Sequence, residues 1–225
     1  MLNRLTTIIK ANQTFFIAYN LLLLIGLYPL LAWDKLTIFL FINKHHHPFL
    51  DPFFFYVTHL GSGITYGLLI LCLLLFKVPY RKILIGVASF GVMSVIVQVL
   101  KRLIFSHHVR PIKFIELAEE VVHLHLVDNV EVLTHLSFPS GHAGTIFTAA
   151  CLLNLITAHK SNLYTLTLLL IAILVSYSRI YLCQHFYTDV YAGMLIGGWT
   201  TFFVYALLID RPIPSWLTNK LPIKV

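Results

Sequence analysis

Charged residues are scarce in this chain of 225 residues. Only 11% are Asp, Glu, Lys or Arg, and 58% are hydrophobic, whereas a soluble domain usually carries about 25% charged residues. This composition excludes an ordinary soluble domain. It predicts a single integral membrane domain over residues 1–225, with no room for a second globular one.

Cysteine is also rare, and the three present, Cys72, Cys151 and Cys183, show no CxxC spacing. An odd count without that spacing argues against a disulfide framework or a zinc knuckle. The histidines outside the motifs described below match no zinc pattern, the nearest being His123-x-His125. We therefore expect neither a metal ion nor a cofactor.

The formal net charge of +7 does not indicate a nucleic acid partner, because the basic residues are scattered among apolar segments and form no tract. The predicted partner is the lipid bilayer. Nothing in the sequence predicts the oligomeric state.

Apolar segments suited to crossing a bilayer, which takes about 20 helical residues, recur along the chain. The first is too long for a signal peptide and has no small-residue cleavage site, so we interpret it as a retained span. The predicted fold is an all-α bundle of six transmembrane helices, at residues 14–33, 52–76, 82–99, 141–158, 163–181 and 188–208.

Between the spans, residues 35–42 predict a short interfacial helix, and Asp51-Pro52 a helix start capped by Asp51. Residues 104–138 predict one long extramembrane loop with a short helix near 115–122. A loop of this length is usually functional or disordered. We favour a function, because it joins two of the motifs below. The tail from residue 210 is expected to be irregular.

The distribution of basic residues predicts a cytoplasmic N-terminus. Six spans then place both termini in the cytoplasm and all the motifs below on the outer face. The four basic residues of the motifs aside, the outer side holds Lys35, Lys44 and Lys113, and the cytoplasmic side holds Arg4, Lys10, Lys77, Arg81, Lys82, Lys160, Arg211, Lys220 and Lys224.

Three short segments carry the chemistry. Pro139-Ser140-Gly141-His142 precedes the fourth span, where a helix N-terminus offers free N–H groups to an anion. Alone, this segment could equally be an ordinary Ser cap and Gly turn. His185 and Asp189 are four residues apart, so a carboxylate could orient an imidazole for nucleophilic attack. The simpler alternative is an interfacial histidine and a helix-capping Asp.

Cations complete the pattern. Arg179 ends an apolar span, where a charge is costly and usually functional, and Lys101, Arg102 and Arg110 follow the third span. A single cation there would more often touch lipid headgroups. Several cations on the same face as two histidines favour a site that neutralises a phosphoryl group.

These segments resemble the type 2 phosphatidic acid phosphatase superfamily, which includes vanadium haloperoxidases and bacterial acid phosphatases. That family pairs Lys-x6-Arg-Pro with Pro-Ser-Gly-His and Ser-Arg-x5-His-x3-Asp. The second motif is complete here, and the third matches from Ser178 to Asp189. The first departs, because Lys101 lies nine residues before Arg110 instead of seven. Either two residues are inserted or Arg102 replaces the lysine, and we prefer Lys101.

The resemblance implies a role for each site residue. His185 would form a phosphohistidine, Asp189 would orient it, and His142 would act as general acid and then activate water. The phosphate oxygens would be held by Lys101, Arg110, Ser140, Gly141 and Arg179. The family's chemistry needs no metal. Roles for His107 and His108 stay open.

The implied function is a lipid phosphatase of the bacterial inner membrane with an outward-facing site. Undecaprenyl pyrophosphate is our first choice of substrate, with lipid A or phosphatidylglycerol phosphate as alternatives. A lipid phosphotransferase would differ only in the phosphoryl acceptor. A haloperoxidase is disfavoured in a membrane chain. A non-catalytic binder or transporter of lipid phosphates would need the cations but not the spacing of His185 and Asp189.

Overall fold

The computed structural model describes residues 2–118 and 122–212, with side chains from residue 4 onward. Part of the short helix expected at 115–122, and most of the tail expected to be irregular, lie outside these residues. Every regular element in the described part is helical, which confirms the all-α class. In chain order they are α1 (Leu2–Ala11), α2 (Gln13–Ala32), α3 (Lys35–Lys44), α4 (Leu50–Val57), η1 (Thr58–Gly61), α5 (Gly63–Leu75), α6 (Tyr80–Val99), η2 (Leu100–Ile104), α7 (Pro111–Leu117), α8 (Gly141–Ile156), α9 (Asn162–Tyr181) and α10 (Tyr187–Leu208).

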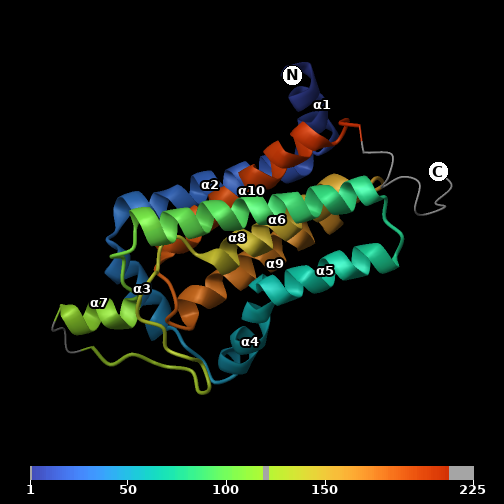
Figure 1. The fold of residues 1–225 in the computed structure, drawn as a ribbon. Coiled ribbons are helices and arrows are strands. Elements are labelled where there is room, and N and C mark those ends of the chain that lie inside the picture. Colours follow the sequence, from blue (N-terminus) through green and yellow to red (C-terminus); the bar gives the residue numbers. More distant parts are fainter. Residues whose placement is uncertain (1, 119–121, 213–225) are drawn as a thin grey trace.

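Figure 1 shows the long helices running roughly alongside one another, with α3, α7 and the long loop gathered at one end of the bundle. The end of α10 lies near α1 at the other end, where Arg4 pairs with Asp210 at 2.9 Å. The loop and the starts of α8 and α10 therefore share the same end of the molecule.

Four described stretches are long and apolar enough to cross a membrane: α2, α6 continued through η2, α9 and α10. A fifth would be the pair formed by α4 with η1 and by α5, which is bent by 60°. The predicted fourth span, α8, has only 16 residues, which rise about 24 Å against a hydrocarbon core of about 30 Å. Membrane-spanning helices are confirmed, and the count of six stays a prediction.

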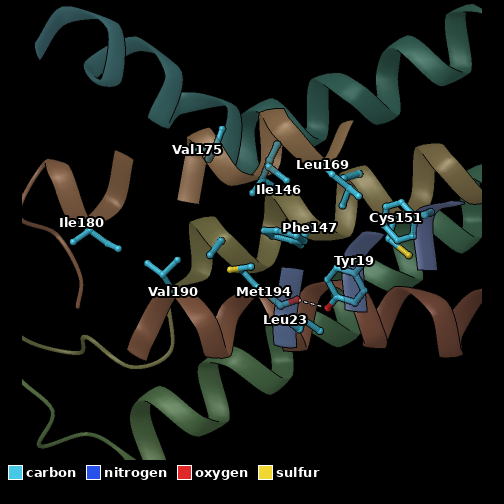
Figure 2. Close-up of a cluster of buried hydrophobic side chains, with 14 of the residues drawn as sticks. Tyr19, Leu23, Ile146, Phe147, Cys151, Leu169, Val175, Ile180, Val190 and Met194 are labelled. Carbon is cyan, nitrogen blue, oxygen red and sulfur yellow. Dashed lines mark hydrogen bonds between the residues drawn. The ribbon is translucent and has the colours of Figure 1, made fainter. Parts of the chain in front are cut away.

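Helix α8 is the centre of the bundle, and nearly all of its side chains are buried. Figure 2 shows Phe147 of α8 among side chains from α2, α9 and α10. Tyr19 of α2 reaches into this core and donates a hydrogen bond to the carbonyl of Met194 at 2.8 Å. An apolar helix enclosed in this way is held by side-chain packing on every face.

The closest helix contact is between α8 and α10. An added Cβ at Gly197 would overlap the carbonyl oxygen of Gly144, and one at Gly193 would overlap that of Ser140. Gly193 and Gly197 form a GxxxG pattern, which lets two helix backbones touch where lipid supplies no hydrophobic drive for association. This contact fixes the start of α8 against the start of α10.

Two local predictions need correction. Asp51 does not cap the second span, because α4 begins at Leu50 and Asp51 lies inside its first turn. Its carboxylate instead accepts a hydrogen bond from the Tyr181 hydroxyl and pairs with His125 at 3.0 Å. The short loop helix also begins earlier than expected, at Pro111, which suits the first position of a helix. By contrast, α3 matches the predicted short helix and is capped by Asp34.

The close contact at Gly197 leaves no space for a larger side chain. Gly197→Ala should destabilise the protein by about 1–3 kcal/mol, because overpacking a close contact forces the backbones apart. Gly67→Ala is the matched control, since an added Cβ there meets nothing within 4 Å and alanine favours a helix by about 0.5–1 kcal/mol. Thermal unfolding in detergent checks both. Equal midpoints for the two variants would contradict the packing role of Gly197.

Candidate functional site

All three sequence motifs meet at one end of the bundle. Lys101 lies in η2, Ser140 is the N-cap of α8, and Arg179 lies in the last turn of α9. His185 lies in the loop between α9 and α10, and Asp189 in the first turn of α10. A backbone hydrogen bond of 2.9 Å from Ser140 N to the carbonyl of Asp189 joins the second motif directly to the third.

His185 and Asp189 form a buried pair. The imidazole Nδ1 lies 3.3 Å from Asp189 Oδ2, and the two residues are 2% and 3% exposed. They do not share a helical face, because α10 begins only at Tyr187. Asp189 Oδ2 also accepts from Phe186 N at 3.1 Å and so caps α10 as well. The catalytic and capping interpretations of Asp189 are therefore compatible.

The surroundings of His185 keep its ring neutral. Burial, joined by the positive charges of Arg110 and Arg179, lowers the pKa of the imidazole to about 3, although the hydrogen bond to Asp189 acts in the opposite direction. A neutral ring that donates from Nδ1 to Asp189 must carry its lone pair on Nε2. This is the form in which an imidazole can attack an electrophile.

The structure favours Lys101 over Arg102 as the motif lysine. Lys101 interacts electrostatically with Arg110, Asp189 and Arg179, whereas Arg102 is exposed and donates from Nε to Gln98 Oε1 at 3.0 Å. The longer spacing to Arg110 begins in η2, a π-helical turn with a hydrogen bond of 2.8 Å from Phe105 N to the carbonyl of Leu100. Such wide turns are often found at functional sites.

Arg110 and Arg179 are both 7% exposed. Arg110 donates from Nη1 to the backbone and side-chain oxygens of Gln184, at 2.8 and 3.1 Å, and from Nε to the carbonyl of His135 at 3.0 Å. Arg179 donates from Nη1 to Thr58 Oγ1 at 2.7 Å. In the described part of the chain neither guanidinium lies within 4.0 Å of a carboxylate. The Asp189 carboxylate interacts with Arg110 at longer range, but the positive charges of Lys101, Arg110 and Arg179 outnumber it, and this surplus favours binding of an anion.

The start of α8 borders the same space. His142 interacts electrostatically with Arg179, His185 and Arg110. Ser140 is fully buried, and its Oγ accepts from Ala143 N at 3.5 Å. An added Cβ at Gly141 would meet only Val97, at 4.0 Å. The first turn of α8 thus leaves room for a ligand close to its backbone.

Three further residues contact the predicted ones and were not identified from the sequence. Ser137 donates to Asp189 Oδ2, Gln184 accepts from Arg110, and Thr58 accepts from Arg179. Gln184 lies in the unspecified part of the third motif, and Thr58 lies in another span. No spacing rule marks either of them.

The long loop is attached to the site through its main chain. The carbonyl of Glu131 accepts from Gln184 Nε2 at 2.8 Å, and that of Thr134 accepts from the backbone N–H of Arg110 at 2.8 Å. His108 lies at the base of the loop, where its ring contacts Phe105 and Phe138. Across residues 2–118 and 122–212, no three His, Cys, Asp or Glu side chains are placed to share a metal ion.

Comparison with known proteins gives a consistent family. A model of the PAP2 superfamily matches residues 83–212. The lipid A 4'-phosphatase of Porphyromonas gingivalis is 27% identical over 191 residues, which are 83% of this chain and 77% of that protein. The undecaprenyl-diphosphatase of Sulfolobus acidocaldarius is 41% identical over 80 residues, but these are only 36% of this chain and 37% of that protein.

Two solved structures share the fold. The structure of Aquifex aeolicus LpxE has a TM-score of 0.63 and 30% identity, and the match covers 77% of this chain and 96% of that one. A PAP2-type phosphatidylglycerolphosphate phosphatase from Bacillus subtilis has a TM-score of 0.61 at 21% identity, covering 95% and 98% of the two chains. The second likeness supports the fold alone.

The state of the His185 ring can be measured. In 15N-histidine NMR spectra in detergent, assigned by comparison with His185→Gln, we expect the neutral ring with its proton on Nδ1 from about pH 8 down to about pH 5. Because the pKa of this imidazole is lowered, the ring takes up a second proton only at a pH well below the ordinary histidine pKa of about 6.5. A His185 signal that titrates between these pH values would contradict the burial argument.

Proposed function

Because the chain belongs to the PAP2 superfamily, whose matched relatives include lipid phosphatases, we propose that this integral membrane phosphatase removes the terminal phosphate of a membrane lipid through a phosphohistidine on His185. The observation that carries the proposal is the pair of buried guanidiniums, Arg110 and Arg179, held without carboxylate partners beside the neutral ring of His185. Such a site favours a phosphate dianion.

In the first step, Nε2 of His185 attacks phosphorus, a P–N bond forms and the bond from phosphorus to the lipid oxygen breaks. Positive charge develops on the imidazole, and the Asp189 carboxylate at Nδ1 stabilises it. His142 must enter this step as the imidazolium; it transfers its proton to the departing lipid oxygen and becomes neutral. Lys101, Arg110 and Arg179, with the Ser140 hydroxyl and the backbone at Gly141, neutralise the oxygens of the transferring phosphoryl group.

In the second step, His142 takes a proton from water, and the resulting hydroxide attacks the phosphohistidine. The P–N bond breaks, inorganic phosphate leaves and His185 returns to its neutral form. The three cations supply the charge stabilisation that many phosphatases obtain from metal ions. A phosphotransferase would use the same first step and replace water by another acceptor.

For the substrate, the comparisons favour lipid A phosphate. The lipid A 4'-phosphatase matches 83% of this chain, whereas the undecaprenyl-diphosphatase matches 36%. Undecaprenyl pyrophosphate, our first choice from the sequence, becomes the second candidate, with phosphatidylglycerol phosphate third. All three present a terminal phosphate at the membrane surface, where the site would meet it.

We further propose that the site faces outward from a bacterial inner membrane. The basic residues Arg81, Lys82 and Lys160 lie at the end of the bundle opposite the site, where they donate to main-chain carbonyls near the ends of α8 and α10. A surplus of Lys and Arg marks the cytoplasmic side. The site then lies on the other side of the membrane.

The first test is phosphate release by the purified protein in detergent, with EDTA present, from lipid A, undecaprenyl pyrophosphate and phosphatidylglycerol phosphate. We expect release from at least one lipid, and a loss of about 10³-fold or more in His185→Ala, because the nucleophile is gone. His159→Ala is the matched control, an exposed histidine just after the end of α8, whose other end borders the site. Release that persists in His185→Ala, or that EDTA abolishes, would overturn the proposal.

The second test traps the intermediate. With undecaprenyl pyrophosphate labelled in its terminal phosphate, the leaving group departs readily without an acid, so His142→Ala should still form the phosphoenzyme but hydrolyse it slowly. We expect turnover to fall by about 10²- to 10⁴-fold while labelled protein accumulates on an alkaline gel. The double variant His142→Ala, His185→Ala should carry no label. Equal labelling of both variants would place the phosphoryl group elsewhere.

A further inference from the structure

The second long helical stretch is broken beside the site. Helix α4 passes into the short 3-10 turn η1, and α5 then leaves at an angle of 60°. Ser62 caps the new helix by accepting a hydrogen bond from Thr65 N at 3.1 Å. The break therefore has its own cap and turn, and it is a built feature of the fold.

The broken segment lies directly against the motif helices. An added Cβ at Gly61 would come within 2.9 Å of the His142 carbonyl oxygen and 2.8 Å of Val175 Cγ1. Glycine at this position lets η1 approach the first turn of α8 and the side of α9 together. One wall of the site is thus formed by a segment that contains none of the three motifs and lies outside the matched residues 83–212.

Thr58 is the residue of this segment that touches the site. It is 6% exposed, and its hydroxyl oxygen accepts the hydrogen bond of 2.7 Å from Arg179 Nη1. Arg179 Nε is buried and has no hydrogen-bond partner in the described part of the protein. In a planar guanidinium, holding Nη1 leaves the edge formed by Nε and Nη2, which is one of the edges that bind two phosphate oxygens side by side.

We propose that Thr58 is a positioning residue for phosphate binding. By holding Nη1 of Arg179, it fixes the plane of the guanidinium and keeps the edge of Nε and Nη2 free for the phosphoryl oxygens. This inference rests on the proposed function, since it assigns phosphate binding to Arg179. It makes the second helical stretch part of the phosphate site.

The test uses Thr58→Val, which keeps the shape of the side chain and removes the acceptor, and Thr58→Ser, which keeps the acceptor. Binding of inorganic phosphate is measured by calorimetry, and kcat/KM on the best lipid substrate in parallel. We expect both affinity and kcat/KM to fall by about 10- to 100-fold in Thr58→Val, the effect of losing a hydrogen bond to a charged group. Thr58→Ser should stay within about threefold of wild type.

Thr201→Val is the control for placing valine at a buried threonine, because Thr201 is fully buried and its hydroxyl donates to the carbonyl of Gly197 in its own helix at 2.7 Å. It should bind phosphate like the wild type. A double variant then shows whether Thr58 acts through Arg179. In the Arg179→Ala background, Thr58→Val should cause no further loss, since residues that act together are not additive.

Two results would overturn the positioning role: phosphate affinity kept within about threefold in a folded Thr58→Val, or a loss of equal size in the Arg179→Ala background. A different result would count against the proposed function. If the wild type binds phosphate but releases none from any lipid, the phosphatase proposal fails, while a weaker phosphate affinity in Thr58→Val still supports the role of Thr58.

Discussion

The rest of this structure depends on the backbone contact between α8 and α10. Glycines at 193 and 197 bring α10 against the carbonyls of Ser140 and Gly144, and Ser140 N bonds to the carbonyl of Asp189 in the same region. The helix that begins with the second motif and the helix that carries Asp189 are thereby held in direct backbone contact. Relative positions in the site are set by main-chain contacts, which vary less than side-chain contacts.

The electrostatic organisation follows from that rigidity. In the described part of the chain no carboxylate lies within 4.0 Å of Arg110 or Arg179, and some of their N–H groups donate to neutral oxygens of Gln184, His135 and Thr58. Neutral acceptors satisfy hydrogen bonds without pairing the charge, and the Asp189 carboxylate offsets only part of it, so the site keeps a net attraction for an anion. A carboxylate in the same place would stabilise the empty protein and weaken the bound state. This choice of partners prepares the site in advance for an anion.

Much of the fold and of the site could be predicted from the sequence, for identifiable reasons. Apolar length located the long helices, and fixed spacing located His142, Arg179, His185 and Asp189, which the structure brings together. What could not be predicted depends on contacts between distant segments. Lys101 is distinguished from Arg102 because Lys101 interacts with Arg110 and Arg179, whereas Arg102 is exposed.

Three other features also depend on contacts between distant segments and could not be predicted from the sequence. The break of the second stretch at Gly61 reflects its approach to His142, and Asp51 is engaged by Tyr181 and His125 instead of capping α4. The short α8 is central because its neighbours enclose it. The Gly61-Ser62-Gly63 sequence is compatible with a helix break, but the contacts that these features make with distant segments have no local sequence pattern.

The attachment of the long loop has a consequence for how such a protein can diverge. Arg110 and Gln184 donate hydrogen bonds to the loop, and the acceptors are the main-chain carbonyls of Glu131, Thr134 and His135. A carbonyl is present whatever the side chain, so mutations in this part of the loop can alter its outer surface while these hydrogen bonds persist. Over generations the outer surface of this part of the loop can therefore diverge while its anchorage to the motif residues is inherited.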